Sequence, residues 1–168
     1  MNAVVVYESV YGNSRQIAEA IAEGLGGVPA LAVAHADEGV VGAADLLVVG
    51  GPTHMHGMTT SLSRKMAVEG AKEDGHAPVE PGAAEEPGLR AWLAQRAGDG
   101  RRAAAFDTRI DRSAALVGSA ARGIAKRLRH QGYELAAGHE SFFVADAEGP
   151  LAEGELDRAR EWGRTLAT

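Results

Sequence analysis

Short apolar runs alternate with amphipathic stretches along the chain, and this alternation constrains the fold more than any other feature. Four runs lack the polar alternation of a half-exposed strand, which is typical of strands covered on both faces. These runs are Ala3–Tyr7 and residues 28–34, 44–49 and 102–106. Residues 133–137 and 141–144 have the composition of one interrupted fifth strand. The sequence therefore predicts a sheet of five strands.

The stretches between these runs show helical spacing. Ile17, Ile21 and Leu25 recur every four positions over residues 14–25, and Gly26 follows as a stop signal. Further helices are predicted over residues 60–70, 89–97 and 113–130, and around Leu156, Ala159, Gly163 and Leu166. Helices that alternate with buried strands imply right-handed crossovers. We therefore expect an α/β fold: a doubly wound five-stranded parallel sheet with helices on both faces.

The composition excludes several classes of protein. The 168 residues suit a single domain over residues 1–168, and the absence of cysteine excludes disulfides, zinc fingers and iron–sulfur clusters. Lys and Arg total 17 against 23 Asp and Glu, so the net charge of −6 disfavours nucleic acid and anionic membranes as partners. The first residues contain neither a basic region nor a long apolar run. We expect a cytoplasmic protein that binds no nucleic acid and no membrane.

An acidic segment interrupts the pattern over residues 71–88. It holds five acidic residues, one lysine and three prolines, and almost no large apolar side chain. This composition is typical of a loop, either a solvated excursion or a functional lid. We expect the segment to be exposed, mobile, remote from the functional site and unnecessary for folding.

The turn after the first predicted strand has the composition of an anion site. Ligands of doubly wound sheets bind beyond the carboxyl ends of the strands. Here the turn leads directly into a helix, whose backbone N–H groups and dipole favour a phosphate. The residues of this turn are Ser9, Val10, Tyr11, Gly12, Asn13 and Ser14. A simple helix cap by Asn13 or Ser14 is the alternative, and neither a G-x-G-x-x-G nor a G-K-S/T motif occurs here.

This turn, the helix after it and the Gly50-x-Pro52-Thr53 pattern after the third run together resemble the flavodoxin-like FMN proteins. The resemblance implies the strand order 2-1-3-4-5, with FMN bound between strands one and three and its phosphate held by Ser9 to Ser14. It implies two further loops beside the flavin ring. The second loop comprises Pro52, Thr53, His54, Met55, His56 and Gly57, and the third comprises Asp107, Thr108 and Arg109. Tyr11, where flavodoxins usually have Thr, is more similar to the quinone-reductase branch.

The two ring loops depart from the flavodoxin pattern in one respect. Flavodoxins sandwich the flavin between aromatic side chains, yet none of the eight aromatic residues lies in 52–58 or 107–113. His54, Met55, His56 or Met58 would form softer contacts and hold the ring less tightly. A metal site at His54 and His56 is disfavoured because zinc needs at least three protein ligands, and we expect no metal. Arg109 suits either a flavin contact or an ion pair with Asp107 or Asp111.

The resemblance implies a redox function. We expect non-covalently bound FMN to transfer electrons to a redox partner protein or to a small-molecule acceptor such as a quinone. The chain would then be an electron carrier or an FMN-dependent oxidoreductase, and the sequence assigns no catalytic residue. The alternative is a binding or interaction module of flavodoxin fold with weak or lost FMN binding, which the missing aromatic residues favour and the phosphate loop opposes.

Overall fold

The computed structural model describes residues 1–168 and contains one sheet of order β2-β1-β3-β4-β5, with parallel pairing between neighbouring strands. Its strands are β1 (Ala3–Tyr7), β2 (Ala30–Ala32), β3 (Leu46–Pro52), β4 (Arg102–Ile110), β5 (Glu134–Leu135) and β6 (Glu140–Val144). Both β5 and β6 pair with β4, so they form one interrupted edge strand. The predicted α/β class and strand order are confirmed.

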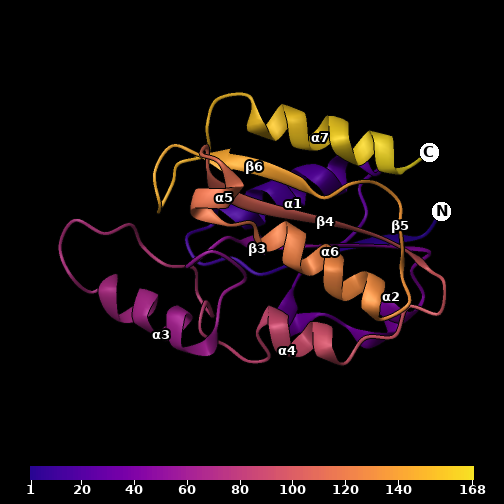
Figure 1. Ribbon diagram of the computed structural model, residues 1–168, viewed down its shortest axis with the longest axis horizontal. Coiled ribbons are helices and arrows are strands. Elements are labelled where there is room, and N and C mark those ends of the chain that lie inside the picture. The colour runs from indigo at the N-terminus through magenta and orange to yellow at the C-terminus, as the bar shows by residue number, and fades with distance from the viewer.

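The helices cover both faces of this sheet (Figure 1). They are α1 (Asn13–Gly24), α2 (Glu38–Gly42), α3 (Ser61–Gly70), α4 (Leu89–Ala94), α5 (Ala114–Val117), α6 (Ala120–His130) and α7 (Glu155–Leu166). Helices α1 and α7 pack on one face, and α2, α4 and α6 pack on the other. Figure 1 shows α3 projecting at the end of the molecule opposite the two chain termini. None of the helices combines the length and hydrophobicity that a bilayer crossing requires.

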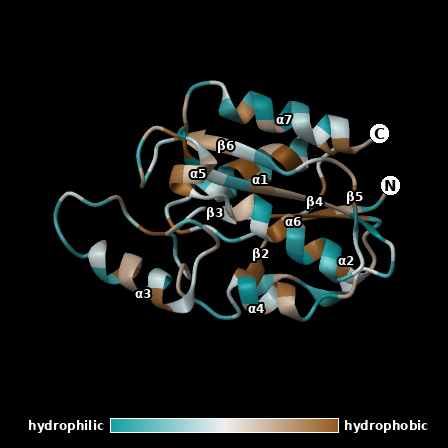
Figure 2. Ribbon diagram, viewed as in Figure 1, coloured by the Kyte–Doolittle hydropathy of each residue, from teal (hydrophilic) through white to brown (hydrophobic).

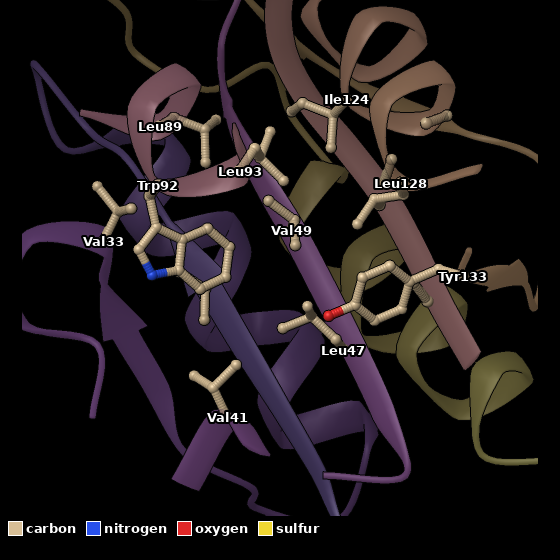
Figure 3. Close-up of a cluster of buried hydrophobic side chains, with 14 of the residues drawn as sticks. Val33, Val41, Leu47, Val49, Leu89, Trp92, Leu93, Ile124, Leu128 and Tyr133 are labelled. Atoms are coloured by element: carbon tan, nitrogen blue, oxygen red, sulfur yellow. The ribbon is translucent and has the colours of Figure 1, made fainter. Parts of the chain in front are cut away.

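Two apolar layers hold these helices to the sheet. Along β3, Leu47 and Val49 contribute to the layer under α4 and α6, whereas Leu46 and Val48 contribute to the layer under α1 and α7. Figure 2 shows the central strands as hydrophobic and the outer helix faces as hydrophilic. Figure 3 shows the first layer, in which Trp92 packs among aliphatic side chains. Burial on both faces explains why these strands lack polar alternation.

Helices α1 and α7 touch through glycine. A Cβ atom on Gly163 of α7 would lie 2.4 Å from the carbonyl oxygen of Ile21, and one on Gly24 of α1 would lie 2.1 Å from that of Arg160. Real Cβ contacts are longer, so both positions require a residue without a side chain. This close approach fixes α7 against α1 on the same face of the sheet.

The structure corrects the predicted helix over residues 113–130. Gly118 has a φ of 78° and separates α5 from α6, and a Cβ there would lie 2.1 Å from the carbonyl oxygen of His56. Ser119 then caps α6 by accepting from the Arg122 N–H. Leu116 of α5 is 67% exposed, whereas Ile124 and Leu128 of α6 are buried. The predicted strand 28–34 is also shorter, because Val33–His35 forms a 3-10 turn.

The acidic segment is not remote from the predicted phosphate loop, contrary to our expectation. The Glu80 backbone N–H donates to the Val10 carbonyl (2.7 Å), and the Glu80 carboxylate pairs with Arg15 of α1 (2.6 Å). Ala83 is buried, while residues 72–76 are exposed. Unsatisfied polar groups of the first loop and of α1 therefore bring the second half of the segment back to the sheet.

Candidate functional site

One pocket of about 290 Å³ lies beyond the carboxyl ends of β1, β3 and β4. It gathers residues from all three predicted loops, which lie far apart in the sequence. Ten predicted site residues line it: Val10, Tyr11, Asn13, Ser14, Pro52, Thr53, His54, Met55, Thr108 and Arg109. Ser9, Gly12, His56, Gly57 and Asp107 do not line it. We call this cavity the three-loop pocket.

The first loop presents backbone donors at the start of α1. The N–H groups of Ser9, Val10, Tyr11, Asn13 and Ser14 have no hydrogen-bond partner within the protein. The N-cap residue Gly12 has a φ of 93° and provides no side-chain cap. Uncapped N–H groups and the positive end of a 12-residue helix together favour an anion at this position.

The hydroxyl groups of the first loop are engaged by the protein itself. Ser9 Oγ accepts from the Gly12 N–H (3.1 Å) and the Arg15 N–H (3.3 Å). Ser14 Oγ lies 2.7 Å from Thr108 Oγ1, and both residues are buried. These hydroxyls therefore shape the loop, and its free donors are mainly backbone groups.

The second loop forms a strained two-residue turn. His54 and Gly57 exchange backbone hydrogen bonds of 2.7 and 3.2 Å, and between them Met55 and His56 have φ values of 49° and 72°. Positive φ at both central positions is typical of a type I′ turn, which usually contains Asn and Gly. A positive φ at a residue other than glycine costs about 1 kcal/mol or more in conformational free energy, and this turn contains two such residues. Met55 is 80% exposed and lines the three-loop pocket, whereas His56 lies on the opposite side of the turn, outside this pocket.

The third loop contains a buried carboxylate beneath the pocket. Asp107 is fully buried, and its Oδ2 accepts from the Thr53 hydroxyl, the Ser119 hydroxyl and the Ala121 N–H. It therefore joins the ends of β3 and β4 to the start of α6. Asp107 Oδ1 has no hydrogen-bond partner and lies 4.0 Å from Arg109 Nε.

Arg109 supplies the cation of the three-loop pocket. Its Nε donates to Ser141 Oγ (3.0 Å), Nη1 donates to the Arg112 carbonyl, and the guanidinium lies 5.3 Å from the centre of the Phe143 ring. Asp107 lies at the distance limit of an ion pair. The guanidinium is thus held at the pocket by neutral partners and only weakly neutralised.

Glu148 lines the same pocket, and sequence reasoning missed it. Its carboxylate pairs with His76 Nδ1 (2.6 Å) and accepts from the Ala77 N–H (2.6 Å), while its carbonyl accepts from Asn13 Nδ2 (3.2 Å). The Ala77 N–H and His76 lower the pKa of Glu148, and the bond to Glu148 raises the pKa of His76. Burial, followed by the charge of Glu148, raises the pKa of the Tyr11 phenol. No local pattern marks Glu148, because it lies 135 residues beyond Asn13.

Tyr11 is the one aromatic residue that lines the pocket, and it belongs to the first loop. The walls formed by the second and third loops consist of Pro, Thr, His, Met, Arg and Ile side chains. These lining groups fit FMN in two respects, but they differ in one respect from the aromatic enclosure that the flavin ring has in flavodoxins. Free donors suit the phosphate and the walls offer apolar and cationic contacts, but no aromatic pair encloses the ring.

Comparisons with known proteins agree with this arrangement. A family model described as a flavodoxin domain matches residues 4–65, which include β1, the first loop and β3. No curated protein sequence matches the chain.

Solved structures of flavodoxins superpose on nearly the whole chain. A flavodoxin from the domain Archaea is 19% identical, with 99% of this chain and 96% of that chain covered and a TM-score of 0.65. A flavodoxin, WrbA-like protein from Agrobacterium tumefaciens is 22% identical, with 99% and 94% covered and a TM-score of 0.62. Oxidised flavodoxin 1 from Bacillus cereus is 12% identical, with 98% and 95% covered and a TM-score of 0.64. The resemblance indicated by the sequence is confirmed at the level of the fold, and the chain has a flavodoxin-like fold.

Proposed function

We propose that the three-loop pocket binds FMN non-covalently and that the protein transfers electrons through it. The observation that carries this proposal is the set of unpartnered N–H groups at the uncapped start of α1, which opens into a pocket shared by all three loops. Backbone donors at a helix N-terminus are the usual means of holding a phosphate. When bound, FMN supplies the redox chemistry, and the protein controls its orientation and access.

Each loop has its own task in this proposal. The N–H groups of Tyr11, Asn13 and Ser14 hold the phosphate. The turn around Met55 and the side chain of Arg109 border the ring, and the Ser14–Thr108 bond keeps the phosphate end and the ring end in register. Because the exposed Met55 leaves this side of the pocket open, we propose that a small acceptor such as a quinone, or a redox partner protein, approaches here.

The second candidate is a binding or interaction module of flavodoxin fold that has lost tight FMN binding. Two observations favour it. No aromatic pair encloses the ring position, and Glu148 lines the pocket, so that the charge of its carboxylate repels a phosphate. The His76 partner offsets this repulsion when the imidazole is protonated.

Absorbance spectra of the purified protein before and after addition of FMN discriminate between the two functions. We expect saturable binding with a shifted flavin spectrum. Asn13→Asp places a carboxylate among the phosphate donors, and Asn13→Ala removes the same bond to Glu148 without adding charge. FMN affinity should fall at least about tenfold further in Asn13→Asp than in Asn13→Ala. Absence of binding by the folded wild-type protein would favour the interaction module.

A further inference from the structure

A second hollow lies between α4 and α6, on the far side of the turn that borders the three-loop pocket. Its volume is about 640 Å³. His54 and Met55 face the three-loop pocket, whereas His56, Gly57 and Met58 line the second hollow. We call it the α4–α6 groove. No acidic residue lines it.

Three cationic side chains converge on this groove, namely Arg90 from α4 and Lys126 and Arg127 from α6, and His130 of α6 also lines it. Gly123, which has no side chain, leaves the space between them open, and a Cβ there would meet only Met58 Cε, at 3.7 Å. In a chain of net charge −6, α6 carries four Lys or Arg residues, one His and no acid.

These cations have no acidic partners in the protein. No residue of α6 takes part in any ion pair of the structure. The Arg90 guanidinium donates to the backbone carbonyls of Met58 (2.7 Å) and Thr59 (2.9 Å), which leave its charge uncompensated. The helix dipole favours cations in the last turn of α6, but it does not account for Arg90 on another helix. Uncompensated cations around one hollow favour a ligand of several negative charges.

A buried acceptor also lines the groove. Gln131 Oε1 is inaccessible to solvent and has no hydrogen-bond partner in the protein. An unmet acceptor costs free energy unless a donor reaches it. A hydroxyl or amino group of a ligand becomes such a donor when the Gln131 side chain rotates toward the groove, because solvent does not reach Oε1 in its present position. The groove is thus suited to a molecule that combines adjacent phosphates with hydroxyl or amino donors.

We propose that the α4–α6 groove binds a nucleotide-sized small molecule with two adjacent phosphates. Its volume lies within the range of small-molecule sites. Lys126, Arg127 and Arg90 hold the phosphates, and Gln131 accepts from the nucleoside part once its side chain has rotated toward the groove. A concave site of this size suits a compact ligand better than the broad surface of a protein partner.

The test follows the amide signals of the ¹⁵N-labelled protein during titration with inorganic pyrophosphate, ADP and adenosine. Gly123 reports on the groove and Gly12 reports on the first loop, so binding at the two places is distinguished. We expect pyrophosphate to shift the Gly123 signal and ADP to shift it at several-fold lower concentration. Adenosine alone should have little effect.

Two double variants of the same helix localise the site. In Lys126→Ala/Arg127→Ala, affinity for ADP should fall about tenfold or more. In Arg122→Ala/Arg129→Ala, which removes the same charge from exposed positions outside the groove, it should fall less than about threefold. Thermal unfolding checks that both variants fold.

Equal losses in the two double variants would overturn the proposal, because binding would then reflect diffuse charge. So would the absence of Gly123 shifts at millimolar ADP, or equal affinity for ADP and pyrophosphate. The amide signal of Gly123 is recorded in the absence of FMN, so the result does not depend on whether the three-loop pocket binds flavin.

Discussion

The hydroxyl of Ser14 at the start of α1 lies 2.7 Å from the hydroxyl of Thr108 at the end of β4. Both side chains are buried, and the two residues are 94 positions apart in the sequence. This bond joins the loop that carries the anion donors to the loop that carries Arg109. It sets the spacing between the two ends of the three-loop pocket.

Removing one hydroxyl should therefore weaken both the fold and the site. Ser14→Ala leaves Thr108 Oγ1 without its partner, and we expect a loss of about 1–3 kcal/mol in the free energy of unfolding and about 1 kcal/mol in FMN binding. Thr108→Val removes the other hydroxyl. Urea unfolding and FMN titration of the two single variants and the double variant should show losses well below the sum of the single losses. Strictly additive losses would show that the two hydroxyls act independently.

The ion pair between His76 and Glu148 predicts a pH dependence of folding stability. The folded-state pKa of His76 is raised above its usual 6.5, so its contribution is complete below that pH and is lost as the pH rises through the raised value. The folded-state pKa of Glu148 is lowered from 4.5, so its contribution is complete above that pH and is lost as the pH falls through the lowered value. The pair therefore stabilises fully between about pH 4.5 and 6.5.

FMN affinity should depend on the same pair. Above the raised pKa of His76, the negative charge of Glu148, which lines the pocket, is no longer compensated by the imidazolium, so FMN affinity should fall with rising pH. Glu148→Gln should bind FMN more tightly and lose most of this dependence. The phosphate of FMN titrates identically in both proteins and thus cancels in the comparison. If the FMN affinities of the wild type and of Glu148→Gln depend on pH in the same way, the Glu148 carboxylate does not affect FMN binding.

Gly163→Ala tests the contact between α1 and α7. An exposed Gly→Ala change within a helix usually stabilises by about 0.5–1 kcal/mol. Here the new Cβ would lie 2.4 Å from the Ile21 carbonyl oxygen, so we expect destabilisation by about 1–3 kcal/mol. Gly70→Ala, at the end of α3 with nothing within 4 Å, is the matched control and should be neutral or slightly stabilising. Urea unfolding measures both, and a stabilised Gly163→Ala would contradict the observed packing.

Arg109 should raise the reduction potential of bound FMN, because its cation favours added negative charge on the ring. If Arg109→Ala removes about 1 kcal/mol of the stabilisation of the reduced flavin, the two-electron potential becomes about 20 mV more negative. Arg122→Ala removes an exposed charge outside the pocket and should leave the potential unchanged. Equilibration with a redox dye measures the reduction potential of FMN bound to the wild type and to each variant. Equal shifts in Arg109→Ala and Arg122→Ala would show that Arg109 does not act on the flavin from within the pocket.

Local patterns in the sequence were sufficient to predict the sheet. Strands such as β1 and β3 are buried on both faces, so their composition alone identifies them. The first loop was predictable because a strand, a glycine turn and a helix adjoin one another there. The predicted helix over 113–130 was wrong because Gly118 interrupts it with a positive φ, and the neighbouring His56 carbonyl leaves no room for a Cβ at that position.

The charged surroundings of the first loop could not be predicted in the same way. Glu80 and Glu148 reach it from segments 65 and 135 residues away from their partners Arg15 and Asn13. The prolines and acids of the segment over 71–88 indicate a loop, but they do not indicate where that loop returns. Its position depends on the free Val10 carbonyl and on Arg15, which become available only when the sheet has formed.

Recognition of a phosphate by the first loop is tested by parallel titrations of the protein with FMN and riboflavin. The two ligands share the ring and differ in the phosphate. Two or more charge-assisted hydrogen bonds from the loop should make FMN bind about 100-fold more tightly, or roughly 3 kcal/mol. Asn13→Asp should remove most of this difference. Equal affinity for FMN and riboflavin in the wild-type protein would show that the first loop does not recognise the phosphate.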